Sequence, residues 1–493
     1  MSIILVDYYL YNNSSVSTKQ LSMRYSLRPV IIKLNLISLF FITSLNGLLA
    51  QHKSTTKHPN FIVILTDDQG YGDLSINGNP TIKTPNIDRL ALEGQKWTNF
   101  YVAANVCTPS RAGLLTGRLP IRSGMQGTQK ARVLQTNSPG GLPSSELTIA
   151  ELLKQQGYHT AAIGKWHLGS LPQYLPLHNG FDYYFGLPYS NDMARVDSIP
   201  YLKSITEPKN EYFQVPLIRN NEVIEKPAVQ NTLTERYTQE TVKFIKDNKQ
   251  APFFIYLAHS MPHVPLFPNP KFAGKSARGT YGDIIEEIDW SVGEIVKALK
   301  ENGVDNNTYI VFLSDNGPWK LFRELGGSTG PLYGAKGNSY EGGVRVPAVI
   351  WGKTVAAKQV TEIGSSLDIL PTFVKLAGAK LPTDRVYDGY DLSNVLSGKE
   401  NKSPRDEMYY YHGDQLVAVR KGVYKILFYS NSEIAYPDEL KKLEKPLLFN
   451  INVDITERYN IADAHPDIVQ SLITLAEKHN KTIVAVEDQL SKN

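Results

Sequence analysis

The sequence has almost no cysteine and no strong charge bias. Its single cysteine, Cys107, has no partner for an internal disulfide, which excludes a fold stabilised by cystines. The 52 Lys and Arg residues nearly balance the 48 Asp and Glu residues over 493 residues, so composition does not indicate a nucleic-acid partner. Paired cysteines and an HExxH motif are also absent, which argues against a zinc protease.

The sequence does contain enough hydrophobic residues for a large core. Hydrophobic residues make up 42%, which excludes global disorder, and the length is typical of two or three domains. The 28 tyrosines could stack on sugars at a surface, although tyrosine is also ordinary core material.

Residues 1–50 have the pattern of a secretory signal. Basic residues precede the apolar stretch Leu34–Ala50, and polar residues interrupt that stretch, so it would make a poor membrane span. We expect cleavage near Ala50, with Met23 as a plausible true start, and a mature chain that is periplasmic or secreted and has no membrane span. An uncleaved N-terminal anchor is the alternative.

Short apolar runs alternate with amphipathic stretches from residue 60 onward. This alternation predicts an α/β fold, in which helices sandwich a large, mostly parallel sheet. The expected strands are Asn60–Thr66, Thr160–Ile163, Phe253–Ala258, Tyr309–Leu313 and Ala348–Trp351. The expected helices are Pro85–Glu93, Leu147–Gln156, Thr234–Asp247, Ile284–Glu301 and Leu367–Leu376.

The pattern changes near residue 395, so we assign residues 51–395 to the α/β domain and residues 396–493 to a smaller α+β subdomain. The subdomain should hold a short antiparallel sheet and one helix. Its expected elements are the strands Glu407–His412, Gln415–Arg420, Val423–Tyr429 and Leu447–Asn450, and the helix Pro466–Lys478.

Polar side chains follow four of the predicted strands at the point where each strand ends. In open parallel sheets this carboxyl edge is where ligands bind, so these side chains should lie together. The pairs are Asp67 and Asp68, Lys165 and His167, His259 and His263, and Asp315 and Asn316.

Four of these residues offer only oxygen or amide ligands. Asp67, Asp68, Asp315 and Asn316 have the chemistry that a hard cation such as calcium or magnesium prefers. Each pair alone is equally typical of a helix cap or a turn, so the inference depends on their combination.

The segment Cys107–Arg111 (CTPSR) leads into a predicted helix, with Pro109 expected as its first residue. The amides at a helix N-terminus favour an anion, and Arg111 could make a forked contact to a bound oxyanion. This pattern indicates a nucleophilic cysteine or an anion site, with a buried structural thiol as the alternative.

Several motifs together resemble the type I (formylglycine-dependent) sulfatases, arylsulfatase-like members of the alkaline phosphatase superfamily. CTPSR followed by Leu115–Arg118 (LTGR) is similar to their first signature, and Gly157–His167 (GYHTAAIGKWH) is similar to their second. The resemblance continues in order from about residue 60 to residue 430, and Pro262–His263, Asp315–Gly317 and Lys336 also match.

The resemblance implies that a formylglycine-generating maturation enzyme oxidises Cys107 to formylglycine, which is hydrated to a geminal diol. It places one divalent cation, usually calcium with magnesium as the alternative, on Asp67, Asp68, Asp315 and Asn316 beside residue 107. It also implies a set of catalytic and sulfate-contacting residues, namely Cys107, Arg111, Lys165, His167, His263 and Lys336.

Four further residues are candidate substrate contacts, and each could equally be structural. They are His178, Asn191, Asp192 and His259, and His412 is a further candidate from the C-terminal subdomain. The expected function is a secreted sulfatase that hydrolyses a sulfate ester, on a carbohydrate rather than on an aryl alcohol. The alternatives are a metal-dependent phosphatase or phosphodiesterase of the same superfamily, and a non-catalytic protein that binds sulfated glycans through an unconverted Cys107.

Overall fold

A computed structural model describes residues 58–128, 130–433 and 439–492. The predicted signal segment, residues 1–50, lies outside the described residues. Within the described residues, none of the helices combines the length and the apolar character that crossing a membrane requires.

A ten-stranded sheet forms the larger part of the fold, in the order β10-β2-β9-β8-β1-β7-β3-β4-β5-β6. The neighbours from β8 to β4 are all parallel, whereas β9, β5 and β6 run antiparallel to the strands beside them. This is the mostly parallel sheet that the sequence predicts. The strands are β1 (Asn60–Thr66), β2 (Gln95–Tyr101), β3 (His159–Gly164), β4 (Tyr183–Gly186), β5 (Leu217–Arg219), β6 (Glu222–Glu225), β7 (Phe253–Ala258), β8 (Thr308–Ser314), β9 (Ala348–Gly352) and β10 (Lys358–Ser365).

Strand β1 shows why the sheet must be covered on both faces. All seven of its residues are buried, and their side chains alternate between two separate hydrophobic cores. Phe61, Val63 and Leu65 belong to one core, and Ile62 and Ile64 belong to the other. A strand with apolar side chains on both faces is stable only where both faces of its sheet are covered.

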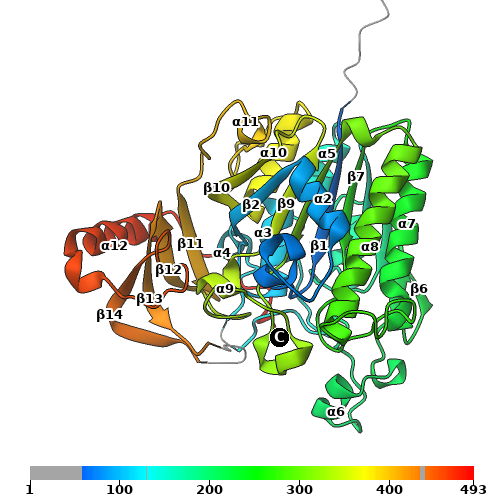
Figure 1. The fold of residues 1–493 in the computed structure, drawn as a ribbon, viewed down its shortest axis with the longest axis horizontal. Helices are drawn as coiled ribbons and strands as arrows, with labels where there is room; N and C mark the ends of the chain where they lie inside the picture. Colours follow the sequence, from blue (N-terminus) through cyan, green and yellow to red (C-terminus); the bar gives the residue numbers. More distant parts are fainter. Residues whose placement is uncertain (1–57, 129, 434–438, 493) are drawn as a thin grey trace, which may run out of the picture. The chain divides into compact units, whose positions relative to one another are not determined.

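Helices provide this cover on each face. The second core includes buried residues of α2 (Pro85–Glu93), α7 (Leu233–Asn248) and α8 (Thr280–Glu301), and the first includes residues of α3, α5 and α10. Figure 1 shows α7 and α8 side by side along the sheet, and these two helices contact each other. The other helices are α3 (Cys107–Thr116), α4 (Pro120–Ser123), α5 (Ile149–Lys154), α6 (Tyr201–Thr206), α9 (Glu341–Val344), α10 (Ile369–Leu376), α11 (Ser393–Leu396) and α12 (Pro466–Asn480).

A separate four-stranded sheet follows at the C-terminal end, as expected. Its strands are antiparallel throughout, and α12 packs against β12. The strands are β11 (Glu407–His412), β12 (Gln415–Lys421), β13 (Tyr424–Ser430) and β14 (Lys441–Asn450). The position of the boundary at residue 395 stays a prediction.

The helix α5 is shorter than the predicted Leu147–Gln156, because its ends are set by local chemistry. The Thr148 hydroxyl accepts the Glu151 N–H, and the Glu151 carboxylate accepts the Thr148 N–H, so the helix begins at Ile149. Gly157 lies just beyond with a φ of +81°, a conformation that favours glycine and stops the helix.

Helix α8 buries the carboxyl group of Glu287, which has no ion-pair partner among residues 58–128, 130–433 and 439–492. Glu287 is 2% exposed; its Oε2 accepts the Asn269 N–H at 3.1 Å, and its Oε1 has no hydrogen-bond partner among the described residues. Burial raises the pKa of Glu287 to about 7, against the opposing effect of the Asn269 N–H. The folded protein therefore holds this proton more tightly than the unfolded chain does.

We predict that Glu287 makes the protein less stable as the pH rises from about 4.5 to about 7. Its contribution is fully present below the unfolded pKa and lost as the pH passes the folded pKa, up to roughly 3 kcal/mol. Glu287→Gln should flatten this part of the pH profile, measured by urea unfolding between pH 4.5 and pH 8. The half-exposed Glu294→Gln on the same helix is the control. Identical profiles for wild type and Glu287→Gln would contradict the prediction.

Candidate active site

The register of the central strands brings the first two acidic segments together. Thr66 of β1 lies opposite Ser314 of β8, so the residues that follow them leave the sheet at the same level. The Asp315 N–H donates to the Thr66 carbonyl at 3.0 Å, and the Asp68 N–H donates to Asp315 Oδ1 at 3.1 Å. Parallel pairing of β1 and β8 therefore places the acidic side chains next to one another, 247 residues apart in sequence.

Three buried carboxylates form the acidic centre of the site. Asp67, Asp68 and Asp315 each place an oxygen within 4.8 Å of the other two. Asp67 Oδ1 and Asn316 Oδ1 are buried and have no hydrogen-bond partner among the described residues. Asp67 Oδ1 lies 3.5 Å from Arg111 Nη2. Burying oxygens that accept no hydrogen bond costs free energy, and a hard cation is the ligand that such oxygens bind. These four side chains therefore fit a divalent cation.

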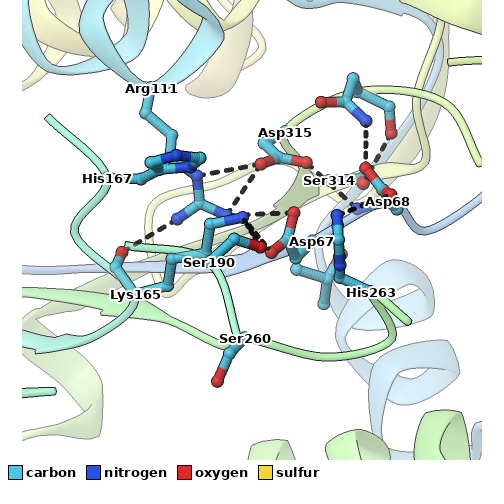
Figure 2. A network of polar contacts seen from close by, with 12 residues as sticks. Asp67, Asp68, Arg111, Lys165, His167, Ser190, Ser260, His263, Ser314 and Asp315 are labelled. Carbon is cyan, nitrogen blue, oxygen red and sulfur yellow. Dashed lines mark hydrogen bonds and ion pairs between the residues drawn. The ribbon is translucent and has the colours of Figure 1, made fainter. Parts of the chain in front are cut away.

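Three basic side chains face this acidic centre, and Figure 2 shows two of them, Arg111 and Lys165. Lys165 Nζ lies 2.6 Å from Asp67 Oδ2, Arg111 Nη2 lies 2.8 Å from Asp315 Oδ2, and Lys336 Nζ lies 2.8 Å from Asp68 Oδ2. The three formal positive charges balance the three negative charges. A bound divalent cation would leave the site positive, which favours an anionic ligand.

Burial and these ion pairs shift the pKa values of Asp67 and Asp315 in opposite directions. Burial would raise the pKa of Asp67, but attraction to Lys165 and the other cations outweighs it and lowers the pKa well below its usual value. Burial and then repulsion by Asp67 raise the pKa of Asp315 to about 7, against the attraction of Arg111. The two carboxyl groups thus differ in proton affinity because they share one site.

Cys107 is the first residue of α3, two residues earlier than the predicted start at Pro109. Pro109 occupies the third helical position, where an N–H has no partner within the helix, so proline is tolerated there. Cys107 is 3% exposed and packs with Val106 and Val133. Burial raises the pKa of its thiol, and Lys165 and Lys336 only partly oppose this effect.

A cavity of about 250 Å³ reaches Cys107 from the surface. Five of the predicted site residues line it: Cys107, His167, Asp192, His263 and Lys336. The remaining lining residues are Val133, Gln135, Thr136, Ser190, Met193, Ala194, Arg195 and Trp319. Most of them belong to loops beyond the strand ends, and the lining is mainly polar.

The two lining histidines are buried in a cationic environment. His167 Nε2 lies 2.9 Å from the Leu134 carbonyl oxygen, and burial followed by repulsion from Lys165 lowers its pKa well below its usual value. His263 Nε2 lies 3.6 Å from Asp68 Oδ2, and burial followed by repulsion from Lys336 lowers its pKa. In both rings these surroundings disfavour the charged form.

Four of the other candidates lie away from the cavity lining. His178 is exposed at the end of a short 3₁₀ helix, and Asn191 is buried, where its amide donates to Gln230 and to the Pro265 carbonyl. His259 is buried 6.4 Å from the Tyr237 ring, and burial lowers its pKa to about 3. His412 is buried at the end of β11.

Three residues near the site have roles that the sequence did not suggest. The Lys165 ammonium donates to Ser190 Oγ at 3.1 Å, and Lys336 Nζ lies 4.5 Å from the centroid of the Trp319 ring. Arg132 donates to Asn105 Oδ1 and to the Gly337 carbonyl, and so ties the segment before Cys107 to the loop that holds Lys336. The sequence offered one indication of these roles, because Trp319 lies four residues after Asp315. Nothing in the sequence pattern indicated a role for Arg132.

Known proteins share this architecture over nearly the whole chain. The sulfatase family profile matches residues 59–379, and the profile for the C-terminal region of aryl-sulfatase matches residues 403–493. Mouse N-acetylgalactosamine-6-sulfatase is 37% identical, with 92% of each chain covered. Human arylsulfatase A is 39% identical, with 86% of this chain and 88% of that protein covered. The crystal structure of Ps i-CgsB in complex with k-i-k-neocarrahexaose superposes with a TM-score of 0.72 and 32% identity, over 88% of this chain and 94% of that one.

We predict that a divalent cation stabilises the fold through the acidic centre. Calcium at 100 times its dissociation constant should add about 2.7 kcal/mol to the free energy of unfolding, and EDTA should remove this gain. Asp67→Asn should abolish the calcium-dependent rise in melting temperature, whereas the exposed Asp197→Asn should keep it. A calcium response that survives Asp67→Asn would contradict this assignment of the site.

Proposed function

We infer the function from one premise, which is that the chain belongs to the sulfatase family. Its relatives are sulfuric ester hydrolases, and the chain is an enzyme of that class. We propose more specifically that it is an exported sulfatase that acts on a sulfated carbohydrate through a formylglycine at position 107 and one bound calcium ion.

The observation that carries the proposal is the position of Cys107. It begins a buried helix at the inner end of the cavity, and Lys336, His263 and His167 line the same cavity. The raised pKa of the thiol argues against a thiolate nucleophile at neutral pH. Formylglycine at this position, hydrated to a diol, would supply an oxygen nucleophile and a route for releasing sulfate.

The metal part of the proposal rests on the acidic centre. Asp67, Asp68, Asp315 and Asn316 would hold the cation, and their oxygen chemistry suits calcium, with magnesium as the alternative. The bound cation would neutralise negative charge on the sulfate oxygens.

The chain's own cations are held ready for an anionic group. Arg111 is fixed by Asp315 and by the Lys165 carbonyl, so its guanidinium keeps one orientation. Lys165 and Lys336 are fixed by Asp67 and Asp68. Positive groups that are already oriented stabilise the transition state without the cost of reorganisation. Lys336 Nζ and His263 Nε2 both lie against Asp68, and they are the two candidates for donating a proton to the leaving oxygen.

A carbohydrate substrate is supported by the cavity and by the relatives. Gln135, Thr136, Asp192 and Arg195 give the lining hydrogen-bonding groups, and Trp319 adds an aromatic face. Side chains of these kinds bind sugars, through hydrogen bonds to the sugar hydroxyls and through stacking of the sugar ring on an aromatic ring. One similar protein is named for N-acetylgalactosamine 6-sulfate hydrolysis, and another was solved with a neocarrahexaose.

The proposal includes a maturation step and export. An enzyme that generates formylglycine must act on Cys107, and its recognition would use Pro109 and Arg111. The signal-like residues 1–50 support export to the periplasm or the medium.

Mass spectrometry of the peptide that contains Cys107 tests the central step. In active protein from the native host, we expect the mass of a residue in which an aldehyde replaces the thiol-bearing group. Complete retention of the thiol in active protein would overturn the proposed nucleophile, and retention without any turnover would favour a glycan-binding protein. Release of phosphate from phosphate esters with negligible sulfate release would favour the phosphatase alternative.

Cys107→Ala should lower sulfate release by at least about a thousand-fold, because it removes the precursor of the nucleophile. The side chain is small, so the variant should stay folded, with a melting temperature close to that of the wild type. Sulfate release from a panel of sulfated mono- and oligosaccharides, measured by ion chromatography, is the readout. Unchanged release would rule out the proposed mechanism.

A further inference from the structure

Two oppositely charged residues line the cavity but do not pair with each other. Asp192 and Arg195 are three residues apart in the loop between β4 and β5, and both line the cavity that reaches Cys107. Within the described residues, neither side chain has an ion-pair partner within 4.0 Å. The cations of the acidic centre differ, because Arg111, Lys165 and Lys336 each contact a carboxylate.

Both side chains have binding capacity that the protein itself does not use. Asp192 Oδ1 is buried and has no hydrogen-bond partner among the described residues. In the part of the chain that the structure describes, the Arg195 Nη1 group donates only to the carbonyls of Val196 and Ile199, which carry no formal charge to balance the guanidinium. An unpaired carboxylate oxygen and an uncompensated guanidinium are costly to keep in a half-buried loop unless a ligand completes them.

The backbone holds these residues in place. The Val196 N–H donates to the Tyr212 carbonyl at 2.9 Å, and the Gln214 N–H donates to the Ala194 carbonyl at 2.8 Å. Ala194, between the two charged residues, has a φ of +54°, a left-handed conformation that costs free energy in any residue other than glycine. The surrounding contacts therefore impose a loop shape that keeps Asp192 and Arg195 on the cavity wall.

We propose that Asp192 and Arg195 determine specificity for the sugar that carries the sulfate ester. Asp192 accepts hydrogen bonds from sugar hydroxyls, and Arg195 binds a second anionic group of the substrate, either a carboxylate or another sulfate. The inference rests on the proposed sulfatase function and goes further by naming the substrate class, an anionic saccharide that carries at least one charge beyond the sulfate to be cleaved.

Asp192 also influences the chemistry at His263, because its charge raises the pKa of that histidine against the larger effects of burial and Lys336. A change at Asp192 can therefore alter every substrate's rate to some extent. The informative quantity is a ratio of kcat/KM values between substrates, in which an effect common to all substrates cancels.

The experiment compares Asp192→Asn and Arg195→Gln with wild type on three probes: 4-nitrophenyl sulfate, N-acetylgalactosamine 6-sulfate, and a sulfated disaccharide that contains a uronic acid. A disulfated monosaccharide in place of the uronate distinguishes a second sulfate from a carboxylate. Asp192→Asn should lower the sugar-to-aryl ratio of kcat/KM by about ten- to a hundred-fold, the effect of losing a hydrogen bond to a charged group. Arg195→Gln should lower, by a similar factor, the ratio of the doubly charged sugar to the singly charged one.

Asp197→Asn is the matched control, because Asp197 is exposed in the same loop and does not line the cavity. Ratios that stay within two-fold of the wild-type values in both variants would overturn the proposal. If Asp192→Asn does not fold, Arg195→Gln tests the proposal alone, because Arg195 is half-buried. Wild-type protein that releases sulfate from none of the probes would refute the proposed function itself, which is a different outcome from unchanged ratios in an active enzyme.

Discussion

The mutual repulsion of three buried carboxylates is the constraint that the rest of the site must satisfy. Asp67, Asp68 and Asp315 are brought within 4.8 Å by strand ends that lie next to one another. Such an arrangement is unstable unless positive charge lies close by. Arg111, Lys165 and Lys336 come from three different segments and provide that charge. The acidic centre therefore fixes where the cations lie, and these cations are the groups that would meet a sulfate.

The C-terminal sheet contributes to this arrangement through the loop that holds Lys336. The Asn338 amide donates to the carbonyls of Ser432 and Glu433, beyond β13. A few residues later, Glu341 pairs with Lys425 of β13 at 2.9 Å. The second sheet thus supports the position of a residue at the edge of the first. This gives a physical reason for the C-terminal region to accompany the larger domain.

The central strands were predictable because each contains an uninterrupted run of apolar residues. The run Asn60–Thr66 was placed with its observed bounds, and the polar residues after it followed from the way parallel strands end. Strands β2, β4, β5, β6 and β10 were missed. The sequences of β2 and β6, QKWTNFY and EVIE, mix polar and apolar residues without a clear period, and β4 and β5 have only four and three residues. Cys107 and the acidic residues could be singled out from motifs. Arg132 and Arg195 could not, because their roles depend on loops whose path the sequence pattern does not specify.

All ten residues of α3 are buried, from Cys107 to Thr116. Arg111, in the middle of the helix, is 0% exposed. A second protein needs several consecutive residues of a segment in an extended, accessible form before it can hold and alter one side chain. The folded protein has no such accessible residues between Cys107 and Thr116. An enzyme that changed Cys107 would therefore need to reach it before this helix packs.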